Sequence, residues 1–198
     1  INAFHPIDDL DGISDITNKL WKPLLHSFPD LERRDNLIIG GSFQNRVYVS
    51  TVGHLTGTFT NPWLNVPSSG KTIHLRTCEV HQIENEKIIN SHILIDVMDF
   101  IRQAGFWPVN PSLGIEEMWP GPITGEGTRF ENLDLNLSAT SLDQGLTMQR
   151  SLNIKPETDP EASKDYVREK LINHPQKDYW HPKMMWYGPC GKRINRVC

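Results

Sequence analysis

The sequence has 198 residues, of which 37% are hydrophobic and 22% charged, and its formal net charge is −4. These values are typical of a globular protein that buries a core, and they argue against nucleic acid or an anionic membrane as a main partner. No apolar run approaches the roughly 18 residues of a membrane span. The three cysteines lack metal-ligand spacing, and no signal peptide is evident, so we expect free thiols in a cytoplasmic protein: Cys78, Cys190 and Cys198.

The first 35 residues are expected to be helical with irregular edges. Four apolar residues recur there at helical spacing: Ile16, Leu20, Leu24 and Phe28. Pro23 is expected to open a second helical turn or to kink the first, because it lacks a backbone N–H.

Four strands are expected between residues 37 and 96. The runs that predict them are rich in β-branched residues and cover 37–39, 46–59, 72–83 and 88–96. Gly40-Gly41 is expected to form a turn, and Glu84–Lys87 a tight hairpin that makes the last two strands antiparallel. A short helix over Val97–Ala104 should follow and end at Gly105. Helices followed by a meander of strands predict the α+β class.

The second half of the chain has a different composition. Residues 109–160 are rich in Pro, Gly, Asn, Ser and Thr and show little periodicity, which predicts an extended linker or arm. Asp159 is a suitable N-cap for a further helix over 161–173. The sequence therefore predicts a domain over 1–108, an arm over 109–160, and a helix plus strand over 161–198.

Several motifs recur in register before residue 108: Gly53-His54-Leu-Thr-Gly57, Pro67-Ser-Ser-Gly70-Lys71, Arg76-Thr-Cys-Glu79-Val-His-Gln-Ile83, Lys87-Ile88, Asp96 and Gln103-Ala-Gly105. Together they resemble the SnoaL-like polyketide cyclases of the NTF2-like superfamily. The resemblance implies a cone, in which a strongly curved antiparallel sheet wraps around helices and encloses a pocket. It also implies an intramolecular aldol addition on a polyketide ester, with an acid at the strand-to-helix junction as general acid/base. Asp96 holds that position here.

The C-terminal part looks like the opening of another NTF2-like unit. A helix over 161–173 would be followed by Tyr179-Trp180-His181-Pro182, in which His181-Pro182 echoes His5-Pro6. The chain therefore resembles a tandem two-unit protein that is cut within both repeats. We expect the 161–173 helix to pack across the open end of the cone, and a loosely attached tail is the alternative.

Asp96 is the leading catalytic candidate. Alternation along the strand places His92, Leu94 and Asp96 on one face. Apolar surroundings disfavour the charged form of an acid, which suits proton transfer. The alternative is that Asp96 caps the helix that follows it. His92 could share a proton with Asp96 or bind substrate, and His54 could donate to a substrate carbonyl or enolate oxygen. Either histidine could instead be structural.

The candidates for substrate binding lie mainly on the 72–83 strand. Alternation puts His74 and Arg76 on one face and Glu79 and His81 on the other. Arg76 could bind an anionic group or form a surface salt bridge. Glu79 and His81 could form a second acid/base pair or an ordinary contact. Trp63 could line an aromatic pocket or anchor the core.

No metal-ligand, P-loop, dinucleotide-binding or G-x-S-x-G pattern is present, so neither a metal nor a cofactor is expected. The sequence favours a cofactor-independent cyclase or isomerase acting on a small apolar carbonyl compound. A non-catalytic ligand-binding or dimerisation module on the same fold is the alternative. A homodimer is expected by analogy with the superfamily.

Overall fold

The computed structural model describes residues 1–106, 115–116, 121–122, 124–128, 134–151, 178–180, 185–187 and 192–195. The chain divides into two compact units. The first comprises Ile1–Arg129 with Tyr187–Ile194, and the second comprises Phe130–Trp186 with Asn195–Cys198. The expected 161–173 helix and the His181-Pro182 echo lie outside the described residues, and the predicted three-part division of the chain stays a prediction.

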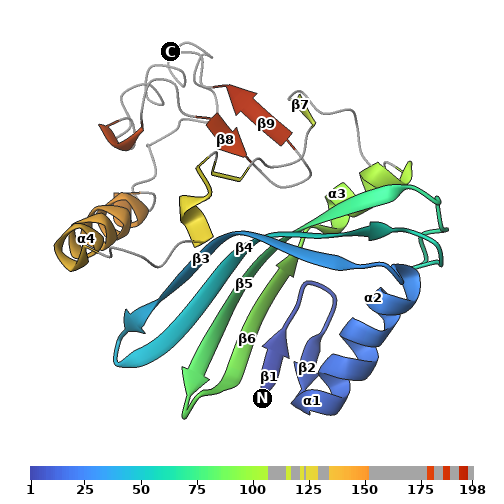
Figure 1. Cartoon of the computed structure of the whole chain (residues 1–198), viewed down its shortest axis with the longest axis horizontal. Coiled ribbons are helices and arrows are strands. Elements are labelled where there is room, and N and C mark those ends of the chain that lie inside the picture. The colour runs from blue at the N-terminus through green and yellow to red at the C-terminus, as the bar shows by residue number, and fades with distance from the viewer. Residues whose placement is uncertain are drawn as a thin grey trace, which may run out of the picture. The chain divides into compact units, whose positions relative to one another are not determined.

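The first unit is built on a curved six-stranded sheet with the order β2-β1-β6-β5-β4-β3 (Figure 1). The strands are β1 (Asn2–Phe4), β2 (Asp9–Asp11), β3 (Glu32–Phe43), β4 (Arg46–Thr58), β5 (Thr72–Glu84) and β6 (Lys87–Ile95). Neighbouring strands are antiparallel except for β1 and β6, which are parallel. The predicted α+β class is confirmed, as is antiparallel pairing of the last two long strands.

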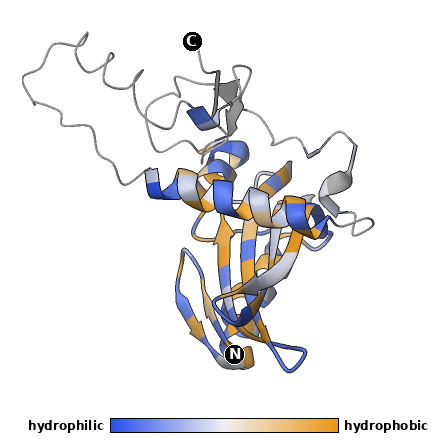
Figure 2. Cartoon of the chain, turned by 90° about the vertical axis from the view of Figure 1, so that its left-hand side faces the viewer, coloured by the Kyte–Doolittle hydropathy of each residue, from blue (hydrophilic) through white to orange (hydrophobic). Residues whose placement is uncertain are grey.

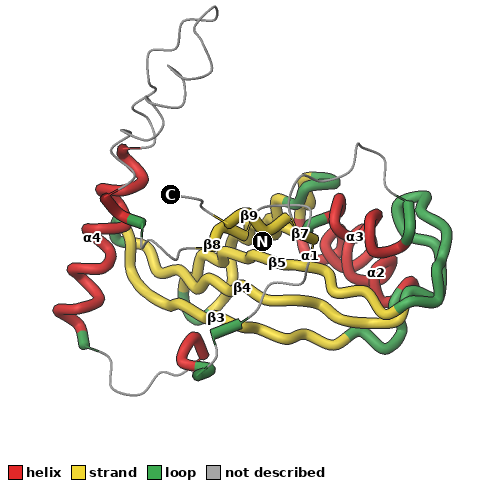
Figure 3. Tube along the Cα trace, turned by 90° about the horizontal axis from the view of Figure 1, so that it is seen from above, coloured by secondary structure: helices red, strands yellow, loops and turns green. Residues whose placement is uncertain are grey.

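The helical segments over residues 12–27 and 97–104 gather at one end of the long strands, as Figure 3 shows. α1 (Gly12–Asp15), the π-helical η1 (Ile16–Trp21) and α2 (Lys22–Ser27) form one continuous helical segment, and α3 (Val97–Ala104) follows β6. Pro23 lies in the first turn of α2. Because proline cannot donate to the carbonyl four residues earlier, the wider π-turn just before it fits this position.

One face of the sheet packs against these helices, and we call it the core face. Strand residues Leu55, Leu75 and Ile93 share a buried apolar cluster with helix residues that include Leu24. An aromatic group lies at its centre: Phe28, Phe59, Trp63 and Phe100. Hydrophobic and hydrophilic residues alternate along the strands (Figure 2), as expected where successive side chains point to opposite faces. We call the other face of the sheet the back face.

The N-terminal region differs from the sequence prediction. Residues before Gly12 form the β1–β2 hairpin, in which buried Ala3 lies opposite buried Leu10. Strands of three residues are too short to show the alternation of apolar and polar residues that predicts a strand, so the sequence did not reveal β1 and β2. β3 begins at Glu32 rather than at Leu37, because the backbone of its first residues pairs with β4, as Glu32 does with Thr56. These first residues are charged, so they show no strand pattern in the sequence.

The expected turn at Gly40-Gly41 is also wrong. Both glycines lie inside β3, where they pair with Val49 and Tyr48 of β4. The chain reverses at Gln44-Asn45 instead, where both residues have positive φ values of 50° and 60°. Asparagine tolerates that conformation, so it can replace glycine in a two-residue hairpin turn.

The region from 109 to 160 is not wholly extended as predicted, because α4 spans Leu135–Ser151. Asp134 begins this helix by accepting hydrogen bonds from the backbone N–H groups of Asn136 and Leu137, at 2.9 and 3.0 Å. The cap offsets the low helix propensity of the Ser, Thr and Gly residues within α4. The remaining short elements are β7 (Ile115–Glu116), η2 (Glu126–Thr128), β8 (Met185–Tyr187) and β9 (Lys192–Asn195), of which β7 and β9 pair antiparallel. None of the helices in the described part is long and apolar enough to cross a membrane.

Candidate functional site

Two polar clusters lie on opposite faces of the sheet. The back-face network comes from β3, β4, β5 and α3 and includes Asn36, His54, His74, Arg76, Asp96, Asp99, Arg102 and Gln103. The core-face cluster consists of Arg33, Asp35, Thr51, Glu79, His81 and Ser91. The expected separation of Arg76 from Glu79 is therefore observed.

Asp96 lies at the junction of β6 and α3, and both of its carboxylate oxygens have partners. Oδ2 accepts a hydrogen bond from Arg76 Nη2 at 2.6 Å, and Oδ1 accepts from the backbone N–H of Asp99 at 2.9 Å. The second contact is an N-cap of α3. The Arg76 side chain is only 2% exposed, so the surface salt bridge suggested for it is instead a buried ion pair. This geometry gives Asp96 a role in joining β5 to α3.

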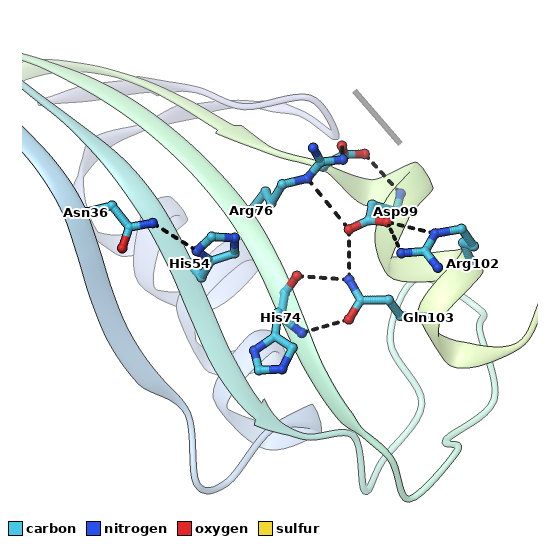
Figure 4. Close-up of polar contacts among 8 residues, drawn as sticks. Asn36, His54, His74, Arg76, Asp99, Arg102 and Gln103 are labelled. Atoms are coloured by element: carbon cyan, nitrogen blue, oxygen red, sulfur yellow. Dashed lines mark hydrogen bonds and ion pairs between the residues drawn. The ribbon is translucent and has the colours of Figure 1, made fainter. Parts of the chain in front are cut away.

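Asp99 and Gln103 extend the network along α3, as Figure 4 shows. Asp99 is buried and accepts from Arg102 Nη2 at 2.6 Å and from Gln103 Nε2 at 2.8 Å. The amide of Gln103 also brackets the backbone of His74, accepting from its N–H and donating to its carbonyl oxygen, both at 2.9 Å. The pairing of β5 with β6 ends at Thr77 and Ile95, so β6 does not reach His74. Gln103 takes the place of a partner strand there. The helical spacing of 96, 99 and 103 was the available sequence signal for these contacts.

His54 is buried opposite Arg76 in the register of β4 and β5. Its Nδ1 lies 3.5 Å from the amide nitrogen of Asn36, and its Nε2 has no hydrogen-bond partner in the part of the chain that is described. Burial lowers the pKa of His54, and the nearby charges of His74 and Arg76 lower it further. His54 is therefore a neutral side chain of the sheet interior. Nδ1 of His74 contacts the Thr56 hydroxyl at 3.1 Å.

The conformation of β3 beside His54 explains the glycine that precedes it. Asn36 is the extra residue of a β-bulge between Asp35 and Leu37. At this bulge the β3 backbone lies so close to β4 that a Cβ on Gly53 would clash with the Arg34 carbonyl oxygen and lie 2.7 Å from Asp35 Cα. A residue with a side chain cannot fit there without moving a strand.

The core-face cluster is centred on Glu79, which is buried. Its Oε1 accepts from Arg33 Nη1 at 2.8 Å, and its Oε2 lies 3.0 Å from His81 Nε2. Burial alone would raise the pKa of Glu79, but the hydrogen bond from His81 and the charge of Arg33 outweigh burial and hold the pKa below its usual value. Glu79 is therefore a buried carboxylate that stays ionised near neutral pH.

His81 bridges this carboxylate to a hydroxyl group. Because ionised Glu79 can only accept, Nε2 of His81 carries the hydrogen of that contact. In the neutral ring Nδ1 is then the acceptor, and it lies 2.9 Å from Ser91 Oγ. The His81 side chain is 15% exposed, whereas Glu79 is 3% exposed. Arg33, Glu79, His81 and Ser91 thus form a continuous chain of hydrogen bonds with a reachable imidazole.

The other two candidates lie elsewhere. His92 is exposed on the back face and stacks on Phe4, with ring centroids 4.9 Å apart. It is four residues from Asp96, or about 13 Å along an extended strand. Trp63 is a core residue that packs against Phe28 and Phe100. Of the two roles considered for it, this position fits an anchor of the core and not the lining of a pocket. The structure therefore brings together Asp96, Arg76, His54 and His74, and separately Glu79 and His81. In the described residues no group of three or more His, Cys, Asp or Glu side chains could hold a metal.

Comparison with known proteins identifies the family. A family model described as SnoaL-like polyketide cyclase matches residues 2–104, just over half of the chain. The chain belongs to the SnoaL-like polyketide cyclase family. The match covers the six-stranded sheet and α3, together with both polar clusters. A comparison with curated proteins gives no match.

Solved structures similar to this SnoaL-like chain include AclR from Streptomyces galilaeus, at 19% identity and a TM-score of 0.46 over 57% of this chain and 71% of AclR. A SnoaL-like polyketide cyclase from Agrobacterium tumefaciens has 20% identity and a TM-score of 0.40 over 52% and 77% of the two chains. IdmH from Streptomyces antibioticus has 16% identity and a TM-score of 0.41 over 52% and 78%.

Proposed function

We propose that this SnoaL-like protein is a cofactor-independent enzyme that performs cyclase- or isomerase-type acid/base chemistry on a small, largely apolar carbonyl compound. The observation that supports the proposal is the contact between His81 and the buried carboxylate of Glu79 on the core face. A histidine held by an ionised acid is a suitable general base, because the carboxylate stabilises the imidazolium that forms when the proton arrives.

The chemistry follows from the tautomer of His81. When substrate binds, the Ser91 hydroxyl turns from His81 Nδ1 to the substrate carbonyl oxygen and donates a hydrogen bond to it. The freed Nδ1 removes a proton from the carbon next to that carbonyl, which leaves an enolate. The enolate carbon attacks a second carbonyl of the same molecule and closes a ring, and the imidazolium returns its proton to the new alkoxide. Arg33 keeps Glu79 ionised throughout.

The sequence-based assignment of Asp96 as the acid/base stays a prediction, and its geometry favours a structural role. An oxygen that caps α3 and another that pairs with Arg76 at 2.6 Å leave the carboxylate little freedom to exchange protons with a substrate. The same observation favours the second candidate function, a ligand-binding module without catalysis. The two functions differ in whether the core-face cluster moves protons.

The experiment uses heptane-2,6-dione, which cyclises by aldol addition and loss of water to 3-methylcyclohex-2-enone, a product that absorbs in the ultraviolet. We expect the wild-type protein to accelerate cyclisation, and Glu79→Gln to lower the rate by about 10²-fold or more because the imidazolium loses its counter-charge. Exchange of the α-protons of the dione in D₂O, followed by NMR, reports enolisation separately. If neither cyclisation nor α-proton exchange is faster than in buffer alone, the result favours the ligand-binding module without catalysis.

A further inference from the structure

An open apolar surface begins where the core-face cluster ends. Along β5 the core-face side chains are buried from Ile73 to Glu79, whereas His81 and Ile83 beyond them are partly exposed. Burial also stops on the neighbouring strands, where Val47 of β4 is 47% exposed and Ile88 of β6 is 42% exposed. The proposed acid/base pair therefore lies at the boundary between the core and an uncovered part of the same face.

The register of the sheet makes this surface continuous. Val49 lies opposite His81. Val47 lies opposite Ile83, which is in turn opposite Ile88. Residues directly opposite each other place their side chains on the same face of a sheet, about 5 Å apart. The apolar strip, as we call it, consists of Val47, Val49, Ile83 and Ile88. It runs from His81 towards the ends of the β3–β4 and β5–β6 hairpins, away from α3 (Figure 1).

Strand β3 leaves one side of the apolar strip open. Gly40 lies opposite Val49 on the core face, and in the described part of the chain no heavy atom lies within 4 Å of the position that its Cβ would take. Its neighbour Gly41 lies opposite Tyr48 on the back face, with equally open surroundings. The two glycines therefore offer a matched pair of positions, one beside the apolar strip and one on the far side of the same strand.

The residue types of the apolar strip favour a saturated hydrocarbon chain. All four side chains are aliphatic, so they gain free energy by burying apolar groups and offer no hydrogen bond or aromatic ring. At its inner end the strip meets the imidazole of His81, whose side chain is 15% exposed. The distance from His81 to Ile83 is two residues, or about 7 Å, which is the length of an alkyl chain of about six carbon atoms.

We propose that the apolar strip binds the alkyl chain of the substrate, and that the substrate is a ketone with a chain of about six carbon atoms on its reacting carbonyl. The carbonyl lies at His81, and the chain runs over Val49 towards Ile88. This inference rests on the proposed function, because the acid/base pair decides which end of the molecule reacts. It adds a substrate class to that function, namely alkyl-chain ketones.

The experiment measures binding apart from catalysis by using alkan-2-ones, which have one carbonyl and cannot cyclise. The full chain, labelled at isoleucine and valine methyl groups, is titrated with butan-2-one, octan-2-one and decan-2-one and followed by NMR. The dissociation constant should fall about twofold per methylene up to octan-2-one, because an open surface buries about half of each group. Decan-2-one should bind no more tightly than octan-2-one. The methyl signals of Val47 and Ile88 should shift, whereas that of Ile39, which is 57% exposed on the back face, should not.

Matched variants test where the chain lies. Gly40→Asp places a charge beside the apolar strip and should weaken the binding of octan-2-one about tenfold, because the carboxylate loses water when the chain lies against it. Gly41→Asp introduces the same charge on the back face and should leave this affinity unchanged. Val47→Ser should weaken the binding of octan-2-one about threefold through the loss of apolar contact.

Three results would overturn the proposal. The first is equal affinity for butan-2-one and octan-2-one, and the second is an equal loss of affinity in Gly40→Asp and Gly41→Asp. The third is a shift of the Val47 and Ile88 signals that grows with protein concentration in the absence of ketone, which would mean that a second copy of the chain covers the strip.

Kinetics separates this proposal from the proposed function. Dodecane-2,6-dione carries a six-carbon chain on one carbonyl and should cyclise with a KM about thirtyfold below that of heptane-2,6-dione. Equal KM values would mean that the substrate does not use the apolar strip. If neither dione cyclises while binding still depends on chain length, the proposed function is wrong and the apolar strip is a binding site for alkyl ketones.

Discussion

Arg76 Nη2 lies 2.6 Å from Asp96 Oδ2, and this ion pair fastens the middle of β5 to the start of α3. The arginine side chain is 2% exposed and the aspartate 13%, so neither charge is well solvated. Asp96→Asn should destabilise the fold by about 3 kcal/mol, because it leaves a buried guanidinium without its main counter-charge while asparagine keeps the cap. Asp96→Ala should cost about 1 kcal/mol more, since the cap is lost too. Urea unfolding measures both.

The matched control for this prediction is the exposed pair between Arg34 and Glu32, which has nearly the same length of 2.7 Å. Both side chains are more than 60% exposed, and such pairs contribute about 0–1 kcal/mol. Glu32→Gln should therefore leave the unfolding midpoint almost unchanged. If Glu32→Gln and Asp96→Asn lowered the free energy of unfolding by similar amounts, burial of the Arg76–Asp96 pair would not make it more stabilising than an exposed pair.

Gln103 is expected to matter for stability through the backbone of His74. Gln103→Met keeps the length of the side chain but removes the donor and the acceptor that bracket His74. The free energy of unfolding should fall by about 2–4 kcal/mol, because a backbone N–H and a carbonyl group at the edge of β5 lose their partners. Faster amide hydrogen exchange at His74 than in the wild type would identify the cause. Unchanged exchange would mean that water replaces the glutamine without cost.

Gly53 should tolerate no larger residue. Its Cβ position overlaps the β3 backbone at the Asn36 bulge, so Gly53→Ala should destabilise the fold by about 3 kcal/mol or more. Gly40→Ala is the matched control, because Gly40 lies in β3 and its Cβ position has nothing within 4 Å. It should be neutral or slightly stabilising, since alanine loses less backbone entropy on folding. Thermal denaturation measures the stability of the two variants. Equal decreases in melting temperature would refute the steric explanation.

The sequence predicted the long strands and α3 well because their signals are local. β-branched runs marked β4, β5 and β6, and Val97–Ala104 is helical as predicted between its acidic cap and Gly105. β1, β2 and the first residues of β3 were missed, because backbone pairing between segments that are distant in the sequence decides their structure. Alternation correctly separated Arg76 from Glu79, as the register of β5 shows.

The site was harder to predict than the fold. Alternation placed Asp96 with His92 and Leu94, but it cannot show which face of a sheet the helices will cover. The structure puts the helices on the face of Glu79 and His81. Which acid lies on the face that the helices cover therefore follows from tertiary packing, whereas the residues of each face follow from the sequence alone.

Stability should depend on pH through His54. Its pKa in the folded state is lowered by burial below the ordinary value of 6.5, so the unfolded chain binds a proton that the folded chain does not. Stability should therefore fall as the pH drops below about 6.5, until the folded-state pKa is reached. His54→Gln should flatten this part of the profile of unfolding free energy against pH. An unchanged slope would mean that other groups carry the effect.

We propose that the core-face pair of Glu79 and His81, and not Asp96, moves the proton. The most direct measurement is the kcat for cyclisation of heptane-2,6-dione by His81→Gln and Asp96→Asn, each shown by circular dichroism to be folded at the assay temperature. We predict that His81→Gln lowers kcat by about 10²–10⁴-fold, whereas folded Asp96→Asn stays within about tenfold of the wild type. Loss of activity in Asp96→Asn with full activity in His81→Gln would contradict the account.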